Sequence, residues 1–175
     1  MKRYLIITVL FFNLFMYSQT LPFPKNDMLY TEFVSYKKAS YLKNPIKTVG
    51  YIVMNGNGNF LFKQISPIVI EVRKKDGRLT FKKENSQPIE IPNSPGGENI
   101  AFLFDKNSNY SNFIITKNVK NNKDFFLVVP KNQDKIEKIE IVSNDDKIES
   151  IILFFKDKSS MTYDFKNTVT GIVPD

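Results

Sequence analysis

The sequence predicts a mainly β domain, formed by a strongly curved antiparallel sheet. From residue 28 onward the chain consists largely of short runs rich in β-branched and aromatic residues, separated by Gly, Asn, Asp and Pro. The connections between successive runs are short, and short connections join antiparallel neighbours. Two runs, at residues 125–129 and 151–155, are apolar at almost every position. We therefore expect both faces of these two strands to be covered, as in a curved sheet with material packed on each side.

The N-terminus has the three parts of an export signal in order. Lys2 and Arg3 form a positive start, residues 4–17 are almost wholly apolar, and Ser18 precedes Gln19 at a suitable cleavage point. A retained membrane anchor is the alternative, but this apolar run is shorter than the roughly 20 residues that a spanning helix needs. We expect a cleaved signal at residues 1–18 and a single soluble domain over residues 19–175.

The first half of the mature chain predicts six strands. Residues 19–27 hold two prolines and are expected to be extended and irregular. Asp76 and Gly77 separate two strand-like runs, and this pair is a strong hairpin signal because both turn positions need positive φ. The predicted strands are 28–39, 46–54, 59–65, 68–75, 78–83 and a brief one at 89–91, inside a proline-rich loop over 84–97.

The second half predicts one short helix followed by five more strands. Residues 98–106 are apolar nearly all round, so this helix must be buried or cover an apolar surface. The strands are expected at 112–117, 125–129, 135–142, 148–156 and 161–165, with turns at 121–122, 144–146 and 157–160. In the last strand Met161, Tyr163 and Phe165 form an apolar side, and Thr162 and Asp164 point the other way.

The composition removes several classes of chemistry. The chain contains no histidine and no cysteine, which excludes disulfides, thiolate nucleophiles and the usual His-based triads and zinc sites. The acidic pair Asp145-Asp146 falls in a predicted turn, and Glu137 and Glu140 belong to a strand face of mixed charge, so we assign no catalysis to them. We expect no enzyme, no metal and no cofactor, with a carboxylate-based hydrolase as the remaining enzymatic alternative.

The charge pattern favours a solvated surface. Loss of Lys2 and Arg3 with the signal lowers the formal net charge from +7 to +5, because residues 1–18 contain no acidic residue. The lysines are interleaved with Asp and Glu instead of being concentrated in one stripe, so we expect no nucleic-acid partner.

The order of elements resembles the outer-membrane lipoprotein carrier family, LolA and its relatives. The resemblance runs from about Phe33 to Phe165 through spaced landmarks. These are TVGYI at 48–52, NFLF at 59–62 with Pro67 after it, the Asp76-Gly77 hairpin before LTF at 79–81, the apolar segment 99–104, FLVVPK at 126–131, two strands around 145–146, and YDFKN at 163–167. Two positions depart from the family: residues 19–27 replace its initial amphipathic helix, and Gly56 stands where it usually has an arginine.

The resemblance implies an unclosed, strongly curved antiparallel β-barrel with a short covering helix, a LolA-like half-barrel. In this family the concave face holds an acyl chain, and the protein ferries lipid-modified cargo across the periplasm. The implied location is therefore the periplasm, with secretion or the cell surface as alternatives. The implied partners are acyl chains of lipoproteins or lipids, an inner-membrane donor and an outer-membrane acceptor protein, and the chain is expected to be a monomer.

Phenylalanine is the chief candidate for a binding surface, with 16 Phe, 8 Tyr and no Trp in the chain. An apolar ligand cavity is lined mainly by such side chains. The candidate cavity residues are Phe60, Phe62, Phe81, Phe102, Phe104, Phe126 and Phe165. The alternative is that these side chains form an ordinary filled core, and that the protein is a non-enzymatic envelope or cell-surface interaction module that uses an exposed strand edge.

Overall fold

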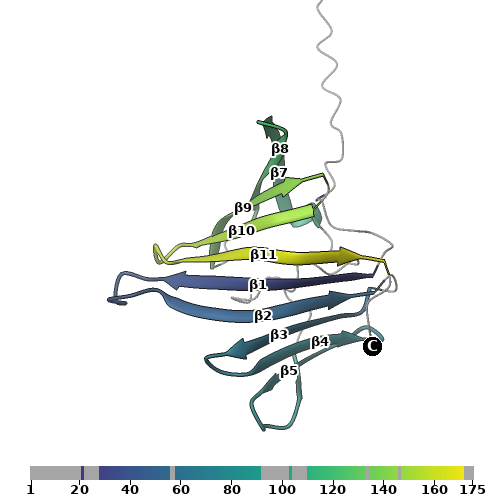
Figure 1. Ribbon diagram of the computed structural model, residues 1–175. Helices are drawn as coiled ribbons and strands as arrows, with labels where there is room; N and C mark the ends of the chain where they lie inside the picture. The colour runs from purple at the N-terminus through teal and green to yellow at the C-terminus, as the bar shows by residue number, and fades with distance from the viewer. Residues whose placement is uncertain are drawn as a thin grey trace, which may run out of the picture.

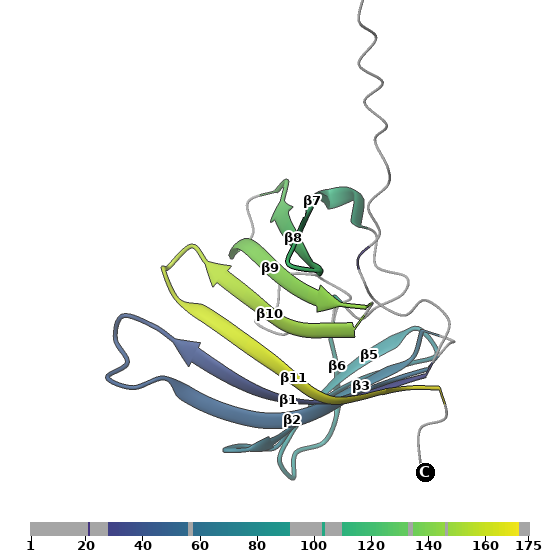
Figure 2. The ribbon, with the colours of Figure 1, turned by 45° about the horizontal axis from the view of Figure 1, so that its top comes forward.

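The protein folds as one open, strongly curved antiparallel sheet of 11 strands (Figure 1, Figure 2). This computed structural model describes residues 21, 28–55, 58–91, 103, 110–132, 135–145 and 147–171. The strands are β1 (Leu29–Lys38), β2 (Ile46–Met54), β3 (Phe60–Ser66), β4 (Ile70–Lys75), β5 (Arg78–Lys83), β6 (Ile89–Glu90), β7 (Phe113–Lys120), β8 (Lys123–Pro130), β9 (Ile136–Asn144), β10 (Lys147–Phe155) and β11 (Ser160–Thr170), and a 3-10 turn, η2 (Tyr110–Asn112), precedes β7.

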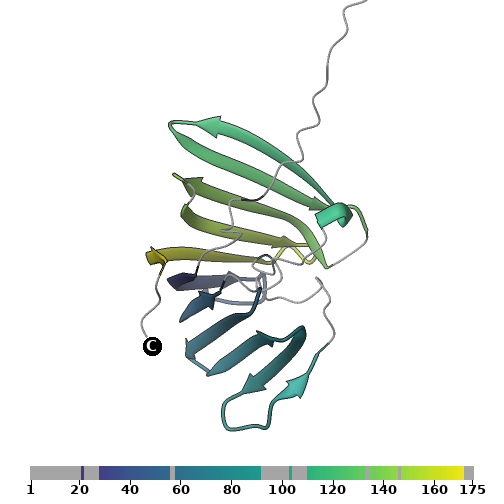
Figure 3. The same cartoon turned by 90° about the vertical axis from the view of Figure 1, so that its right-hand side faces the viewer.

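The strand order places the first and last strands together in the middle of the sheet. The order is β6-β5-β4-β3-β2-β1-β11-β10-β9-β8-β7, so β1 pairs with both β2 and β11. Two meandering arms, β2–β6 and β10–β7, extend from this centre, and the sheet curves so that the arms form the two walls of a half-barrel (Figure 3). Strands β6 and β7 form the two open edges. The predicted unclosed, curved antiparallel sheet is confirmed.

The turn chemistry read from the sequence is also confirmed. Asp76 and Gly77 have φ of 50° and 80°, and Asn121 and Asn122 have φ of 52° and 60°. Positive φ at both central positions is the condition for the tight hairpin turns whose twist matches the flanking strands. These turns fix the register of the β4–β5 and β7–β8 hairpins, with Lys75 opposite Arg78 and Lys120 opposite Lys123.

The core lies on the concave face of the sheet. Alternate residues of neighbouring strands meet there, because successive side chains of a strand point to opposite faces. Leu21 and Leu103, which lie outside the strands, are buried in the same apolar cluster. The strand residues that form its buried centre are Leu29, Phe33, Ile52, Met54, Phe60, Phe62, Val72, Phe126, Val128, Ile136, Ile139, Ile141, Ile151, Leu153, Phe155 and Tyr163.

The convex face differs between the two strands that are apolar on both sides. In β10, Phe154 is partly covered by the Lys138 ammonium, which lies 4.4 Å from the ring centroid. In β8, by contrast, Phe125 and Leu127 remain 37% and 38% exposed. The prediction that both faces of residues 125–129 are covered is therefore wrong for β8. Edge strand β7 has only one neighbour in the sheet, so the β7–β8 hairpin ends this arm.

Three further sequence predictions fall largely or wholly on residues outside the described ranges. These are the export signal at 1–18, the irregular segment 19–27 and the covering helix at 98–106, except for Leu21 and Leu103. Leu103 is fully buried, and its carbonyl accepts a hydrogen bond of 2.8 Å from the Tyr110 hydroxyl. In the part of the chain that the structure describes, no helix has the length and hydropathy needed to span a membrane.

Candidate functional site

The centre of the concave face is an aromatic floor built across β1, β3 and β11. The rings of Phe33 and Phe62 stack with their centroids 5.0 Å apart, and Tyr163 packs edge-on at 5.5 Å from Phe33. Phe165 lies beside Tyr163, with 6.5 Å between ring centroids. The fit depends on Gly50 in β2, because a Cβ there would lie 2.6 Å from Cζ of Phe33. The glycine in the TVGYI landmark therefore makes room for this floor.

Five of the seven predicted cavity residues lie on this concave face. Phe60, Phe62 and Phe126 belong to the buried centre of the cluster, and Phe81 and Phe165 are half-buried and packed against it. They come from both arms and from the middle of the sheet, so the fold brings together residues that are more than 100 positions apart in sequence. The remaining two, Phe102 and Phe104, lie outside the described residues.

The candidate cavity residues predicted from the sequence leave out several apolar residues on the same face. Phe33 and Tyr163 form the floor, and Leu103 is fully buried against the cluster. The period-2 alternation of β1 and β11 was sufficient to place Phe33 and Tyr163 on a covered face. No local signal could have distinguished Leu103 from its apolar neighbours in 99–104.

The concave face also carries a few cationic groups among its apolar residues. Lys74 is 5% exposed, and it lies directly opposite Phe60 on β3 and Leu79 on β5. Lys117 pairs with Asp124 at 2.7 Å, and its ammonium lies 5.4 Å from the centroid of the Phe126 ring. A largely apolar surface with a small number of fixed polar groups is typical of a site for small amphipathic molecules.

The buried hydroxyl groups on this face differ in whether they have a hydrogen-bond partner. Ser35 and Thr48, on the neighbouring strands β1 and β2, hydrogen-bond to each other. Ser143, fully buried in β9, has no hydrogen-bond partner for its hydroxyl. A buried polar group without a partner costs free energy, so Ser143 is a local weak point of the sheet.

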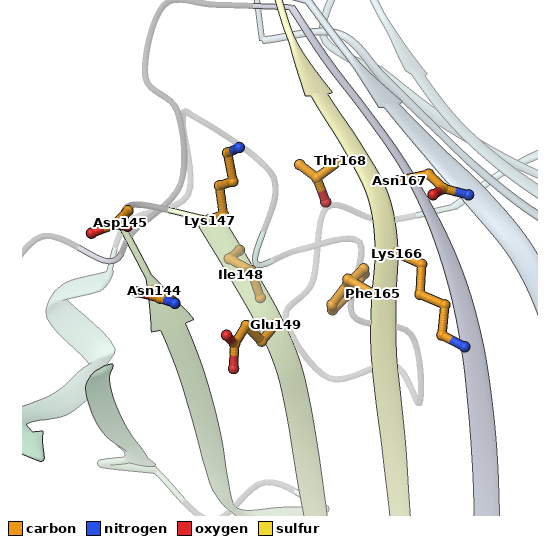
Figure 4. Close-up of a pocket in the computed structure, with 9 residues that line it drawn as sticks. All are labelled: Asn144, Asp145, Lys147, Ile148, Glu149, Phe165, Lys166, Asn167 and Thr168. Carbon is orange, nitrogen blue, oxygen red and sulfur yellow. The ribbon is translucent and has the colours of Figure 1, made fainter. Parts of the chain in front are cut away.

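A pocket of about 420 Å³ opens where β10 and β11 separate (Figure 4). The ladder between these two strands ends at the pair Ser150–Asp164, beyond which Lys147–Glu149 and Phe165–Thr168 no longer face each other as partners. Ile148 and Phe165 point into the space from opposite sides, and Lys147 and Thr168 lie nearer its outer end (Figure 4). We call this space the β10–β11 gap.

Among the described residues, two groups have displaced pKa values, and neither lies on the concave face. Burial, and then the hydrogen bond to Glu32, raise the pKa of Tyr30, whose side chain is on the convex face. The hydrogen bonds from Ser159 lower the pKa of Asp157 in the β10–β11 turn. Within the described ranges no three acidic side chains converge as a metal site would require.

Comparison with known proteins identifies the fold. No family model and no curated protein matches the sequence. Among solved structures, a LolA superfamily protein from Nitrosomonas europaea is similar, with 12% identity, a TM-score of 0.53, and coverage of 87% of this chain and 90% of that one. A chain of the Pseudomonas aeruginosa MucA/MucB complex has 14% identity and a TM-score of 0.50, and the match covers 86% of this chain and 54% of that one. This chain therefore has the LolA-like fold.

Proposed function

We propose that this protein is a periplasmic carrier that binds the acyl chains of lipoproteins or lipids on its concave face and helps to move them to the outer membrane. The observation that carries the proposal is the continuous apolar and aromatic concave face, formed by both arms of an open sheet. The LolA-like fold supports it, because the similar N. europaea structure belongs to a superfamily named for such carriers. The proposal includes export by the signal at residues 1–18 and a mature domain over 19–175.

Differential burial supplies the binding free energy. Each methylene transferred from water to an apolar surface contributes about 0.8 kcal/mol. Leu103 already occupies part of the apolar cluster, so an incoming acyl chain replaces contacts that Leu103 makes in the empty protein. Release follows when Leu103 returns or when an acceptor offers a more favourable apolar site. In this mechanism no bond is made or broken, so the protein acts without a cofactor and not as an enzyme.

The candidate cavity residues keep their proposed role in this scheme. Phe60, Phe62, Phe81, Phe126 and Phe165 offer apolar area from both arms, and Phe102 and Phe104 are proposed to join them. The monomer, an inner-membrane donor and an outer-membrane acceptor remain part of the proposal.

Native mass spectrometry of the mature protein, purified without detergent from a Gram-negative host, tests the proposal directly. We expect an N-terminus at Gln19 and additional bound mass in the range of acyl lipids. A Phe62→Ala variant should lose bound lipid, because Phe62 belongs to the floor, whereas Ile114→Ala on the convex face should retain it. Wild-type protein that is free of lipid and also ignores added fatty acid and lipopeptide would contradict the carrier function.

A second candidate function, a protein-interaction module, is favoured by the outer face and edge of the β7–β8 hairpin. Ile114 of edge strand β7 is 55% exposed on the same face as the exposed Phe125 and Leu127 of β8, and Val119, opposite Asp124 on the other face, is 62% exposed. A long, apolar, open edge strand is a template for pairing with an extended segment of another protein. Lys120 at the end of β7 places a positive charge on this edge, which favours an acidic partner.

The partner for this second function is thus an extended acidic segment that alternates with apolar residues. Fluorescence polarisation with a synthetic peptide of that pattern tests it. Leu127→Lys should abolish binding by placing a charge in the apolar patch, and Lys43→Gln, in the distant β1–β2 turn, should not change it. Equal binding by both variants would reject this surface.

A further inference from the structure

The β10–β11 gap is a defined feature of the sheet, because each of its rims is held by the strand on its other side. On the β10 rim, Lys147 pairs with Asn144 and Ile148 with Ser143 of β9, and a bulge follows before Ser150. On the β11 rim, a bulge relative to β1 lies between Tyr30 and Glu32. Both irregularities fall beside the gap, and a bulge bends its strand away from regular pairing. The two rims diverge for this reason.

Side-chain hydrogen bonds fix the β11 rim in place. Asn167 has a φ of 52°, and its side-chain amide donates to a Glu32 carboxylate oxygen at 2.7 Å. The hydroxyls of Thr168 and Thr31 are 2.8 Å apart, and Thr31 also hydrogen-bonds to the Lys166 carbonyl at 3.3 Å. Because these contacts all tie β11 to β1, they hold β11 away from β10.

The lining of the gap changes from apolar to polar along its depth. Ile148 and Phe165 are half-buried and pack against the apolar cluster, so the deep part of the gap continues into the concave face. Lys147 and Thr168 lie nearer the outer end (Figure 4). Residues Lys147–Glu149 and Lys166–Thr168 line the sides beyond the end of the β10–β11 ladder. An amphipathic molecule with an apolar tail and a hydrogen-bonding head matches this gradient.

The charge at the outer end selects the sign of that head. Glu149 is neutralised by Lys123, whose ammonium lies 2.6 Å from its carboxylate. Lys147 has no ion-pair partner in the described ranges, and it lies next to the gap (Figure 4). Lys166 also lines the gap, and its side chain extends toward the β1 side of β11 (Figure 4). Asp145 also lines the gap, but its carboxylate points away from it (Figure 4). The uncompensated Lys147 ammonium therefore favours a phosphate or carboxylate oxygen.

We propose that the β10–β11 gap is the binding site for the anionic head of an acyl ligand, with a phosphate or carboxylate at the Lys147 ammonium and the acyl chain passing Ile148 and Phe165 to the concave face. This inference rests on the proposed carrier function, because it requires that the concave face takes the chain. The volume of about 420 Å³ is sufficient for a head group and its linkage. The gap thus makes the carrier selective for acyl molecules with a negative charge at one end.

Calorimetric titration of the mature protein with dodecyl phosphate and with dodecanol tests the inference, because the two probes share one chain and differ in the phosphate. Wild-type protein should bind dodecyl phosphate more tightly. Lys147→Gln should weaken dodecyl phosphate binding roughly five- to tenfold, since it removes one charge-assisted contact, and leave dodecanol binding unchanged. The matched control Lys43→Gln, in the β1–β2 turn, changes the charge equally and should keep the preference for the phosphate.

The outcomes separate the two proposals. If neither probe binds to wild-type protein, the carrier function itself fails and the head-group site fails with it. If both probes bind but wild type and Lys147→Gln show the same ratio of affinities, the carrier stands and the head-group site is overturned. If inorganic phosphate alone, at concentrations similar to those of the lipid, binds as tightly as dodecyl phosphate, the gap is a plain anion site and the inference is also overturned.

A photoreactive alkyl phosphate with its diazirine next to the head provides an independent readout. Peptide mapping should find the cross-links on residues 147–149 and 165–168 in the wild type. Cross-links that fall instead on the outer face of β7 and β8 would exclude the gap as the head-group site.

Discussion

At the scale of single residues, Gly50 shows how a small side chain sets the shape of the concave face. A Cβ at this position would lie 2.1 Å from the Lys63 carbonyl oxygen and 2.9 Å from the Gln64 Cα, in addition to its contact with Phe33. Two of these three obstacles are backbone atoms of β3, which cannot move without breaking the β2–β3 ladder. Glycine is therefore required here by close approach and not by its backbone angles.

We expect Gly50→Ala to lower the free energy of unfolding by about 1–3 kcal/mol, as overpacking of a filled site does. Gly77→Ala is the matched control, because a Cβ there meets nothing within 4 Å and only the φ of +80° is unfavourable. That change should cost about 1–2 kcal/mol. Urea denaturation of both variants measures the difference. A fully tolerated Gly50→Ala would show that Phe33 and β3 adjust more easily than this packing implies.

Alanine substitution of the two buried serines, Ser143 and Ser35, should have opposite effects on the free energy of unfolding. Ser143→Ala removes a hydroxyl without a hydrogen-bond partner and should raise the free energy of unfolding by about 1 kcal/mol. Ser35→Ala removes the partner of the Thr48 hydroxyl and should lower it by about 1–3 kcal/mol. Denaturation curves of the pair provide the test, and a loss of stability in Ser143→Ala would mean that this hydroxyl contributes more than its surroundings indicate.

At the scale of elements, the β10–β11 turn links stability to pH. The Asp157 carboxylate accepts hydrogen bonds from the Ser159 hydroxyl at 2.5 Å and from its backbone N–H at 2.9 Å. These bonds favour the ionised form and lower the pKa of Asp157 below its usual range. A carboxyl whose pKa is lower in the folded state stabilises the protein above its unfolded pKa, and this contribution disappears as the pH falls through the folded pKa.

We expect Ser159→Ala to raise the pKa of Asp157 toward its ordinary value, because the Ser159 side-chain hydrogen bond is the largest cause of the shift. The variant should also lose less thermal stability than wild type between about pH 5 and pH 2. NMR titration of the Asp157 carboxyl carbon and melting curves over this range measure both effects. An unchanged pKa in the variant would assign the shift to the backbone N–H of Ser159 instead.

At the scale of the whole molecule, Leu103 affects two properties in opposite directions: the stability of the empty protein and the space available to a ligand. Its side chain is fully buried in the apolar cluster, although it lies in the chain between the two open edges, β6 and β7. Truncation of such a residue removes packing and leaves a space in the apolar face. The empty protein then loses stability, and the same space becomes available to a ligand.

We expect Leu103→Ala to lower the free energy of unfolding by about 2–5 kcal/mol and to strengthen the binding of a fluorescent fatty acid. Leu127→Ala on the exposed face of β8 should change stability by less than about 0.5 kcal/mol and leave binding unchanged. Thermal melts and a fluorescence titration of the same preparations measure the two properties. Weaker fatty-acid binding by a folded Leu103→Ala protein would show that Leu103 contacts the ligand and does not compete with it.

The candidate site was predictable to the extent that it depends on alternation. Phe60 and Phe62 lie on the concave face because residues two apart in a strand share a face, and the same rule would have added Phe33 and Tyr163. The β10–β11 gap could not be predicted, because it depends on two bulges in different ladders that fall beside each other. The alternation of apolar and polar residues is the same wherever two neighbouring strands stop pairing, so it does not reveal the gap.

The sequence by itself determined the strands, the hairpin turns and the apolar character of the concave face, because each is set by residues within a few positions of one another. Positive φ at Asp76-Gly77 and at Asn121-Asn122 follows from the turn residues alone. The tertiary structure decided which strands are neighbours, with β1 beside β11 in the middle of the sheet, and which apolar faces are covered. Those outcomes depend on what lies opposite each strand. Phe125 and Phe154 have similar sequence contexts, but the Phe125 ring is exposed and the Phe154 ring is covered by Lys138.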